Sequence, residues 1–290
     1  MRPTTAAARL FQRTAAARMA LYNDPPAAAA AQASAPSTTP PSPPAPASPE
    51  KLIYAPAGPN PHGQAAQFTR STLSRHALDP TSPAAQFHTW FAAAQASGDA
   101  IPQPEACTLS TAALPSGRVS SRVVYLKELD AGGGFVVYSN LGSSRKAADL
   151  ASNPHAALVF YWPPLQRQVR VEGVAARCDR DRSQAYFDTR VRGSRIGAWA
   201  SRQSQVLEPR GDGDDDGRAQ LDEWVAEAEK RFEGQDHIPV PDFWGGLRIV
   251  PTLVEFWQGR DSRLHDRFVY QWHDAKDGAE GRWELSRLSP

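Results

Sequence analysis

The sequence predicts a mainly β domain, a barrel with helical additions, and two observations support this class. Short runs rich in Val, Ile and aromatic residues recur between Gly- and Pro-containing turns in residues 106–173 and again from residue 243 onward. Segments with the helical spacing of apolar residues are few and lie between these runs. Many short strands separated by isolated helices are typical of a closed sheet with helices added to it.

Residues 1–51 differ in composition and are predicted to be a disordered extension of a single folded domain over residues 52–290. Residues 1–49 contain 16 Ala and 10 Pro, which leaves little to form a core. Four arginines (Arg2, Arg9, Arg13 and Arg18) precede the first acidic residue, a pattern typical of mitochondrial targeting segments. The apolar content of this stretch is thin, which favours the alternative of a cytoplasmic protein with an untargeted tail.

The charge balance predicts that any anion site is local. The chain has 32 basic and 31 acidic residues, a net charge of +1, so no general attraction to nucleic acid or to a membrane surface is expected. No apolar run approaches the roughly 20 residues that a membrane-spanning helix needs. Neither a G-x-G-x-x-G nor a G-x-x-x-x-G-K-[ST] motif is present, so Rossmann and P-loop nucleotide sites are not predicted.

A helix beginning at Pro83, with Ser82 as its N-cap, is the first predicted element. Its apolar residues at helical spacing, Phe87, Trp90 and Ala94 among them, are expected to pack in the core. Further helices are predicted over residues 179–190, 196–202 and 218–232. Strands are predicted over residues 106–112, 119–126, 135–138, 156–162, 168–172, 247–249, 253–257, 267–272 and 283–288.

Two adjacent basic residues give the first local indication of function. Ser143 or Ser144 is expected to cap a helix that ends before residue 153, which places Arg145 and Lys146 in its first turn. Cations in a first turn oppose the helix dipole and lower stability unless an anion binds there. The sequence therefore predicts an anion site at this helix start.

Two other groups of polar side chains are compatible with binding but are not decisive by themselves. Tyr186, Arg190 and Ser194 are spaced four apart and would share one face if a single helix ran through them; all three are phosphate donors. Arg263 and His265 lie in a turn that follows an aromatic strand end. A surface ion-pair cluster is the competing interpretation of that turn.

An acidic stretch, inserted near residues 208–218, matches the EF-hand calcium loop through Asp212, Asp214, Asp216, Gly217 and Glu223. Helix breakers precede it and no second hand is present to pair with it. A solvated insertion is therefore favoured over a calcium site. The seven histidines are scattered, so no metal site is predicted.

Several motifs occur in a fixed order that resembles one known family. They are Arg122-Val-Val-Tyr-Leu-Lys127, Tyr138-Ser139-Asn140, Ser144-Arg145-Lys146, Arg167-Gln168-Val169, Gly197-Ala198-Trp199, Gln203-Ser204, Phe243-Trp244-Gly245-Gly246, and Glu255-Phe256-Trp257-Gln258-Gly259 through Arg263-Leu264-His265-Asp266-Arg267. Together they resemble the pyridoxine/pyridoxamine 5′-phosphate oxidases over residues 106–290, apart from the acidic insertion.

This resemblance implies a split β-barrel homodimer with FMN at the subunit interface. It implies oxidation of pyridoxamine 5′-phosphate and pyridoxine 5′-phosphate to pyridoxal 5′-phosphate, with O2 as acceptor and H2O2 as product. The implied FMN contacts are Arg122, Val123, Val124, Tyr125, Leu126, Lys127, Tyr138, Ser139, Arg145, Lys146, Gln168, Gln203, Ser204, Trp257 and Arg267. The implied substrate-phosphate contacts are Lys127, Tyr186, Arg190 and Ser194, and the implied catalytic residues, facing the pyridine ring, are Arg263 and His265.

The segment around Tyr186 departs from the family's usual pattern at Asp188, Thr189 and Val191, although Arg190 is retained. Val191 stands where the family usually has Pro.

Strand parity raises a separate question. Arg122 and Lys127 are five residues apart, so a flat strand would send them to opposite faces. They can serve one site only through a bulge, a strand end or the two-fold interface.

Two other functions compete with the oxidase. A split-barrel protein that binds FMN or pyridoxal phosphate without turnover would need most of the same residues. Arg263 and His265 favour the enzyme, because simple storage does not obviously require them. A calcium-responsive scaffold would depend on the acidic stretch alone.

Overall fold

The structure is a computed structural model that describes residues 67–211, 213–275 and 280–290. The predicted N-terminal extension and the predicted start of the folded domain near residue 52 lie outside these residues. No helix in the described part is long and apolar enough to cross a membrane.

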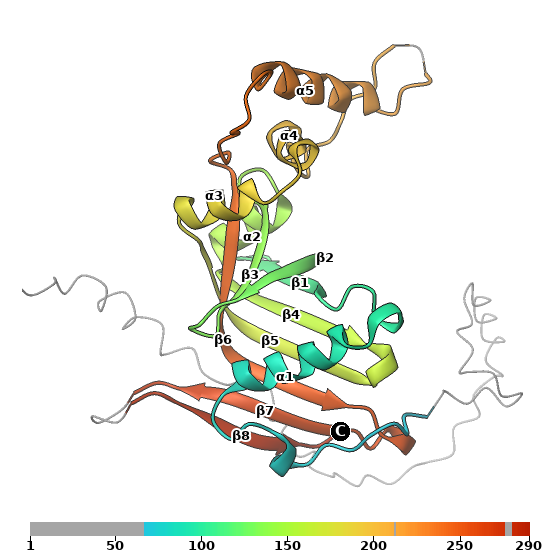
Figure 1. The fold of residues 1–290 in the computed structure, drawn as a ribbon, viewed down its shortest axis with the longest axis vertical. Helices are drawn as coiled ribbons and strands as arrows, with labels where there is room; N and C mark the ends of the chain where they lie inside the picture. Colours follow the sequence, from blue (N-terminus) through green and yellow to red (C-terminus); the bar gives the residue numbers. More distant parts are fainter. Residues whose placement is uncertain (1–66, 212, 276–279) are drawn as a thin grey trace, which may run out of the picture. The chain divides into compact units, whose positions relative to one another are not determined.

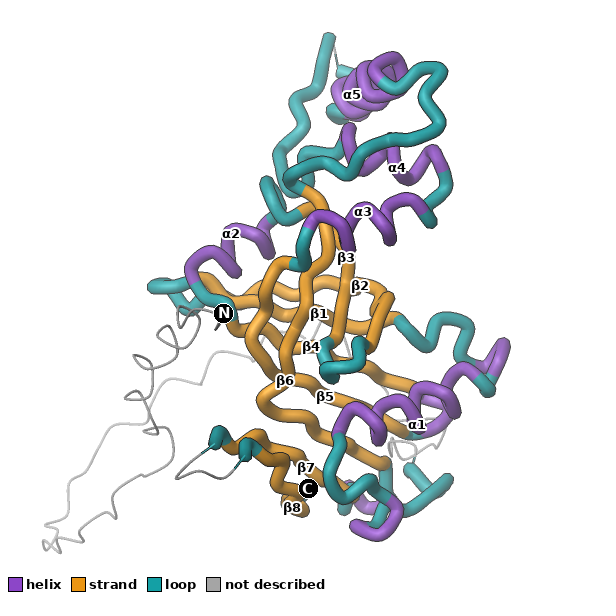
Figure 2. The backbone as a smooth tube through the Cα atoms, turned by 60° about the vertical axis from the view of Figure 1, so that its left-hand side comes forward, coloured by secondary structure: helices purple, strands orange, loops and turns teal. Residues whose placement is uncertain are grey.

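An antiparallel sheet of eight strands forms the centre of the described part (Figures 1 and 2). The strands are β1 (Ala106–Ala113), β2 (Arg118–Leu129), β3 (Phe135–Asn140), β4 (His155–Trp162), β5 (Arg167–Arg177), β6 (Trp244–Gln258), β7 (Asp266–His273) and β8 (Arg282–Leu288). Their order is β3-β2-β1-β4-β5-β6-β7-β8, and β3 also pairs with β6. This pairing closes six strands into a barrel, from which β7 and β8 extend, so the predicted β-barrel is confirmed.

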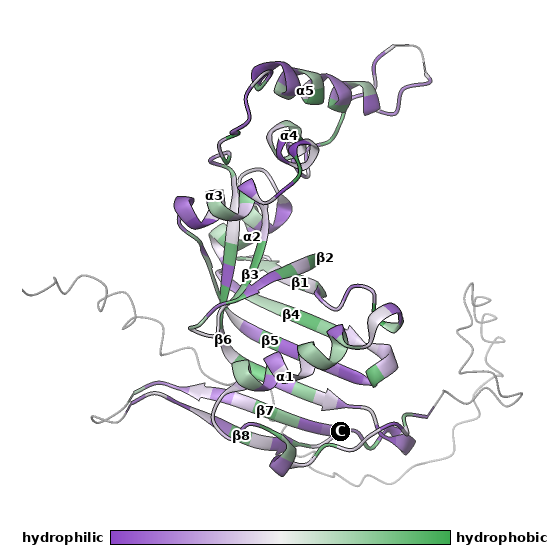
Figure 3. Ribbon diagram, viewed as in Figure 1, coloured by the Kyte–Doolittle hydropathy of each residue, from purple (hydrophilic) through white to green (hydrophobic). Residues whose placement is uncertain are grey.

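Helix α1 (Pro83–Gln95) packs its aromatic face against the barrel interior. Ser82 caps it as predicted, with its hydroxyl accepting the Ala85 N–H at 3.1 Å. The Phe87 ring lies 4.9 Å from the rings of both Phe135 and Phe160, in the edge-on geometry that aromatic pairs prefer. Hydrophobic and hydrophilic residues alternate along the strands (Figure 3), as expected when one face of a sheet is buried.

Four helices lie beyond the barrel core: α2 (Arg145–Ser152), α3 (Arg180–Asp188), α4 (Arg192–Ala200) and α5 (Arg218–Arg231). A second group of buried apolar residues, including Phe187, Ile196 and Trp224, joins α3, α4 and α5. These helices lie near one another in Figure 1. Because the chain leaves the helical conformation between Asp188 and Arg192, Tyr186 and Ser194 stand on different helices. The possibility of a single helix running through both is therefore excluded.

The prediction of two separate strands at residues 247–249 and 253–257 is wrong, because β6 runs through both without interruption. Pro251, between the two predicted strands, lies opposite Gly173 where the β5–β6 register shifts. A bulge is a place where a strand tolerates a residue without an N–H. Gly173 is required there, since a Cβ would collide with the Val250 carbonyl oxygen.

A second bulge explains how Arg122 and Lys127 can face one site although they are five residues apart. Leu126 pairs with Val137 and Glu128 pairs with Val136, so Lys127 is an extra residue in β2. The bulge changes the alternation of faces. Arg122 and Lys127 consequently line the same cavity, although they are five residues apart.

Replacing Gly173 by Ala is expected to lower the free energy of unfolding by roughly 2–4 kcal/mol, because the new Cβ meets backbone on the neighbouring strand. Urea unfolding of both variants measures the effect. Gly193→Ala in α4 is the matched control: its Cβ meets nothing, and it should be neutral or stabilising by under about 1 kcal/mol. Equal stability of the two variants would contradict the tight packing at the bulge.

Candidate active site

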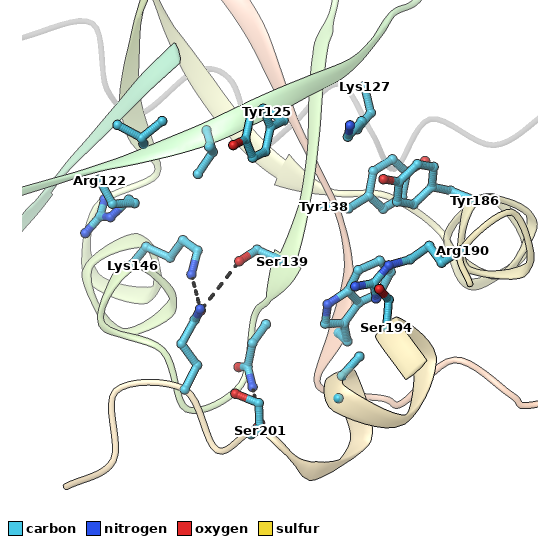
Figure 4. A pocket seen from close by; sticks show the side chains of 17 residues that line it. Arg122, Tyr125, Lys127, Tyr138, Ser139, Lys146, Tyr186, Arg190, Ser194 and Ser201 are labelled. Carbon is cyan, nitrogen blue, oxygen red and sulfur yellow. Dashed lines mark hydrogen bonds between the residues drawn. The ribbon is translucent and has the colours of Figure 1, made fainter. Parts of the chain in front are cut away.

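A cavity of about 590 Å³ opens beside β2 and β3 and is bordered by α3 and α4. Figure 4 shows its side chains, with Arg122 and Lys146 on one side and Tyr186, Arg190 and Ser194 on the other. The lining residues are Arg122, Val123, Val124, Tyr125, Lys127, Tyr138, Ser139, Asn140, Lys146, Tyr186, Arg190, Ser194, Gly197, Ala198, Ser201, Gln203 and Trp244. The cavity thus combines most of the predicted FMN contacts with all four predicted substrate-phosphate contacts.

The Arg122 side of the cavity carries two cations, Arg122 and Lys146. Lys146 comes from the first turn of α2 and is 5% exposed, and its Nζ donates to Gln203 Oε1 at 2.5 Å. Burial, with the nearby Arg122 guanidinium, lowers the pKa of Lys146 to about 8. Among the described residues no carboxylate forms an ion pair with either cation. Ser144 caps α2, so the basic residues lie at a helix start as predicted.

The opposite side of the cavity carries a separate cation, Arg190. Its guanidinium lies 4.8 Å from the centroid of the Trp244 ring. The Nη1 atom is buried without a hydrogen-bond partner, and burial lowers the pKa of Arg190. A buried polar donor left unpaired is costly, and an anionic ligand would satisfy it.

Stacked aromatic rings line the cavity between its Arg122 side and its Arg190 side. The Tyr138 and Tyr186 rings are stacked with centroids 3.8 Å apart. The Tyr138 hydroxyl donates to Glu128, which also accepts from Arg182 at 2.6 Å. Burial first, and then Glu128, raise the pKa of Tyr138. Tyr138 therefore stays protonated and presents its ring rather than a charge to the cavity.

Five predicted site residues form a second group, at the far end of β6. Gln168 on β5 and Arg267 on β7 both pair with Trp257 on β6. The Trp257 ring lies 4.6 Å from the ring of His265. Arg263, the fifth member, belongs to the same turn as His265 and forms no ion pair with a described residue.

The turn that carries Arg263 and His265 is held in an uncommon conformation. Ser262 and Arg263 both have positive φ values, 53° and 65°, which are unfavourable for side chains with a Cβ. The Nδ1 atom of His265 accepts the Arg260 N–H at 3.1 Å, and burial, with the cationic Arg263 and Arg267, lowers the pKa of His265. At neutral pH the ring is thus uncharged and carries its proton on Nε2, so it can donate a hydrogen bond from that atom.

The two groups lie at opposite ends of β6. Tyr138, in the cavity, pairs with Gly246 near the start of β6, whereas Trp257 lies eleven residues further along the same strand. At about 3.3 Å per residue this is roughly 36 Å of strand. Figure 1 shows β6 running from the α3 end of the barrel toward β7.

Three predicted residues belong to neither the cavity lining nor the second group: Leu126, Arg145 and Ser204. Leu126 is buried in the core and its N–H bonds the Glu105 carbonyl. Ser204 accepts the Arg145 N–H at 3.1 Å, beside the cavity but not in its lining. The residues that were not predicted are Asn140, Gly197, Ala198, Ser201 and Trp244. All of these except Ser201 belong to motifs that carried the family resemblance, so the motifs could have indicated them as site residues. No motif in the sequence indicates Ser201.

Carboxylates of the acidic stretch interact with groups close to them in the sequence. Asp215 accepts backbone N–H groups from Arg210, Gly217 and Ala219, and Glu223 forms an ion pair with Arg210. In the described part of the chain no group of three His, Cys, Asp or Glu residues could hold a metal ion; Asp212 lies outside that part.

Comparison with known proteins supplies the decisive observation. Residues 94–211 match the family model of pyridoxamine 5′-phosphate oxidase, and residues 244–290 match that of the pyridoxine 5′-phosphate oxidase C-terminal dimerisation region. The chain is 50% identical over 244 residues to a probable pyridoxamine 5′-phosphate oxidase of Schizosaccharomyces pombe, covering 83% of this chain and 96% of that protein. It is 48% identical to the pyridoxamine 5′-phosphate oxidase of Saccharomyces cerevisiae, covering 82% and 95%. The chain belongs to the pyridoxamine 5′-phosphate oxidase family.

Solved structures agree with the split-barrel fold of this family. PhzG from Burkholderia lata, solved with tetrahydrophenazine-1-carboxylic acid, has a TM-score of 0.62 and 26% identity, covering 76% of this chain and 98% of that one. A pyridoxamine 5′-phosphate oxidase-related, FMN-binding protein from Nostoc punctiforme has a TM-score of 0.53 at 18% identity, covering 72% and 98%. The second similarity concerns the fold alone.

If Lys146 holds an anion in this pyridoxamine 5′-phosphate oxidase family member, binding must weaken as the lysine loses its proton. Sulfate is a suitable probe for the flavin-free protein because its charge is constant between pH 7 and 9. Its affinity, measured by calorimetry, should fall by up to roughly tenfold per pH unit above about pH 8. Lys146→Gln should remove this pH dependence, while Arg145→Gln, outside the cavity lining, should retain it. A Lys146→Gln variant with the wild-type slope would contradict the assignment.

Proposed function

We propose that this protein is an FMN-dependent oxidase that converts pyridoxamine 5′-phosphate and pyridoxine 5′-phosphate to pyridoxal 5′-phosphate, reducing O2 to H2O2. The observation that carries the proposal is one cavity with two separate cation groups, in a chain about half identical to named oxidases of this kind. Two cation groups suit a reaction in which cofactor and substrate each bring a phosphate.

FMN fits the Arg122 side of the cavity. A cavity near 590 Å³ is within the range of roughly 300–1,000 Å³ that small-molecule sites occupy. Arg122 and Lys146 are partly or fully desolvated without an ion pair to a carboxylate, which a bound phosphate would offset. Ser139 and Gln203 add neutral hydrogen-bonding groups beside Lys146. We assign these four residues to the cofactor.

The Arg190 side of the cavity then receives the substrate phosphate. Arg190 supplies charge and an unpaired Nη1 donor, and Tyr186 and Ser194 supply hydroxyls. Lys127, placed at the β2 bulge, adds a second cation from the other edge. When bound, FMN provides the ring that accepts the electrons from the C4′ carbon of the substrate and passes them to O2. The protein side chains bind and orient the two phosphates so that this carbon is held in place.

A second copy of the chain completes the site. The group around Arg263 and His265 is separated from the cavity by most of β6, so a partner subunit must bring its own group to it. Apolar residues on the cavity side of β2 are exposed, with Val123 at 68% and Tyr125 at 42%. The matched dimerisation region, residues 244–290, contains both Arg263 and His265. We therefore propose a homodimer in which each site combines the cavity of one subunit with Arg263 and His265 of the other.

His265 and Arg263 then act from the partner side by hydrogen bonding and charge. His265 is neutral and donates from Nε2, so its role is to orient a substrate acceptor atom rather than to remove a proton. Arg263 is held in a positive-φ turn and is free of a carboxylate partner among the described residues, so its charge is available to the bound ring or its substituents.

Oxygen uptake with pyridoxamine 5′-phosphate tests the function and the residue roles together. Arg190→Ala should raise KM by roughly 30-fold or more, because a charge-assisted phosphate contact is lost. Pyridoxamine without the phosphate is the matched control, and its low rate should be insensitive to Arg190→Ala. Arg263→Ala should lower kcat/KM with both compounds. A yellow wild-type protein that consumes no oxygen would indicate a flavin-binding protein without this activity.

Complementation between impaired subunits, assayed at a substrate concentration below the wild-type KM, tests the shared site. Arg190→Ala and Arg263→Ala chains, co-expressed under two tags, form mixed dimers in which one site carries both changes and the other carries neither. Purified mixed dimers should recover about half of the wild-type activity per dimer, since one of two sites is intact. Mixed dimers no more active than either parent would show that each subunit uses its own Arg263.

A further inference from the structure

Asp149 is a buried carboxylate that has no part in the site described so far. It lies on α2, one turn after Lys146, and is 2% exposed. Its Oδ2 atom accepts from the Thr111 hydroxyl on β1 at 2.7 Å and from the Ser120 hydroxyl on β2 at 2.6 Å. The hydrogen bond from Ser120 is the largest of the effects that lower the pKa of Asp149, so the group is ionised at neutral pH.

The same two hydroxyls hold Arg122. Arg122 Nη1 donates to Thr111 Oγ1 at 2.9 Å, and Nη2 donates to Ser120 Oγ at 2.6 Å. A hydroxyl has one proton, and an ionised carboxylate can only accept. Both protons must therefore point to Asp149, which leaves the hydroxyl lone pairs directed at the guanidinium. The ionised carboxylate thus sets the direction of every bond in the chain from Asp149 to Arg122.

This arrangement keeps one edge of Arg122 free. Of the five N–H donors, one goes to Thr111, one to Ser120 and one to the Leu109 carbonyl at 3.2 Å. The two that remain, on Nε and Nη2, have no partner among the described residues, and Arg122 lines the cavity. Two N–H groups of one guanidinium are the donor set that a phosphate accepts in bidentate fashion.

Two other arginines of the barrel show the contrast. Arg267 uses Nε and Nη2 to bind Glu255, at 2.8 and 3.2 Å, and Arg248 uses the same two atoms to bind Asp130, at 2.5 and 2.9 Å. In both, a carboxylate occupies the edge that an anionic ligand would need. At Arg122, the Asp149 carboxylate is separated from the guanidinium by a hydroxyl group. It therefore stabilises the cation without occupying the Nε–Nη2 edge.

We propose that Asp149 is a positioning residue that, through Thr111 and Ser120, holds Arg122 with its free edge toward the phosphate of the cofactor. This inference rests on the proposed function, because it takes the anion to be the phosphate of FMN. A purely structural role, in which Asp149 only docks α2 onto β1 and β2, is the alternative that the experiment must separate.

The test compares FMN with riboflavin, which lacks the phosphate, in flavin-fluorescence titrations of the full chain freed of flavin. Asp149→Ala should weaken FMN binding by roughly tenfold and riboflavin binding by less than about twofold, because only the phosphate contact depends on Arg122. Asp149→Asn keeps an acceptor oxygen and should be intermediate. Ser120→Ala removes one of the two hydroxyls that connect Asp149 to Arg122 and should weaken FMN binding by roughly threefold. Asp79→Asn, which changes a carboxylate that caps a turn far from the cavity, should leave the FMN-to-riboflavin ratio unchanged.

A double-substitution cycle separates positioning from helix docking. In an Arg122→Ala background, Asp149→Ala should cause no further change in the FMN-to-riboflavin ratio, because its effect passes through Arg122. An undiminished effect in that background, or equal losses for FMN and riboflavin, would overturn the proposal. If Asp149→Ala does not fold, Ser120→Ala takes its place in the cycle. Its effect on the FMN-to-riboflavin ratio should likewise disappear in the Arg122→Ala background. Failure of the wild-type chain to bind FMN would instead refute the proposed function.

Discussion

The pairing of β3 with β6 is the constraint on which the other features depend. It closes the barrel and places Tyr138 and Ser139 opposite Gly246 and Gly245. Gly246 permits this approach, since a Cβ there would lie 2.8 Å from Cys178 Sγ and 3.1 Å from the Tyr138 ring. One strand therefore carries one wall of the cavity at its start and the Trp257 group at its end. The length of β6 makes the second subunit a requirement of the proposed site.

The distribution of ion pairs distinguishes the arginines that bind carboxylates from the cations of the cavity. Away from the cavity, buried carboxylates bind arginines directly, as Glu255 binds Arg170 and Arg267. In the cavity, Arg122, Lys146 and Arg190 are desolvated without such partners. Burying cations in this way costs free energy that the apolar barrel core must offset when no ligand is bound. In the proposed function, bound phosphates offset this cost, which couples ligand affinity to the architecture of the fold.

Local chemistry explains why so much of the fold could be predicted from sequence. Ser82 and Ser144 cap their helices as expected, because a cap depends only on residues three positions away. β6 was predicted wrongly as two strands, because Pro251 is accommodated inside it at a bulge, and that bulge involves Gly173 on another strand. The position of Lys127 likewise depends on an irregular β2–β3 register, which no spacing along one strand reveals.

By itself the sequence determined the secondary structure of most segments, the family and the residue types able to bind phosphate. Those properties follow from local spacing and from motif order along the chain. Only the tertiary structure decided which of these residues share a cavity, with Tyr186 and Arg190 facing Arg122 and Lys146, and which lie apart from it at the far end of β6. It also revealed Asp149, an acid between Ala148 and Leu150 whose role depends on two hydroxyls on β1 and β2. Register, burial and hydrogen-bond direction arise between residues distant in sequence, so no local pattern encodes them.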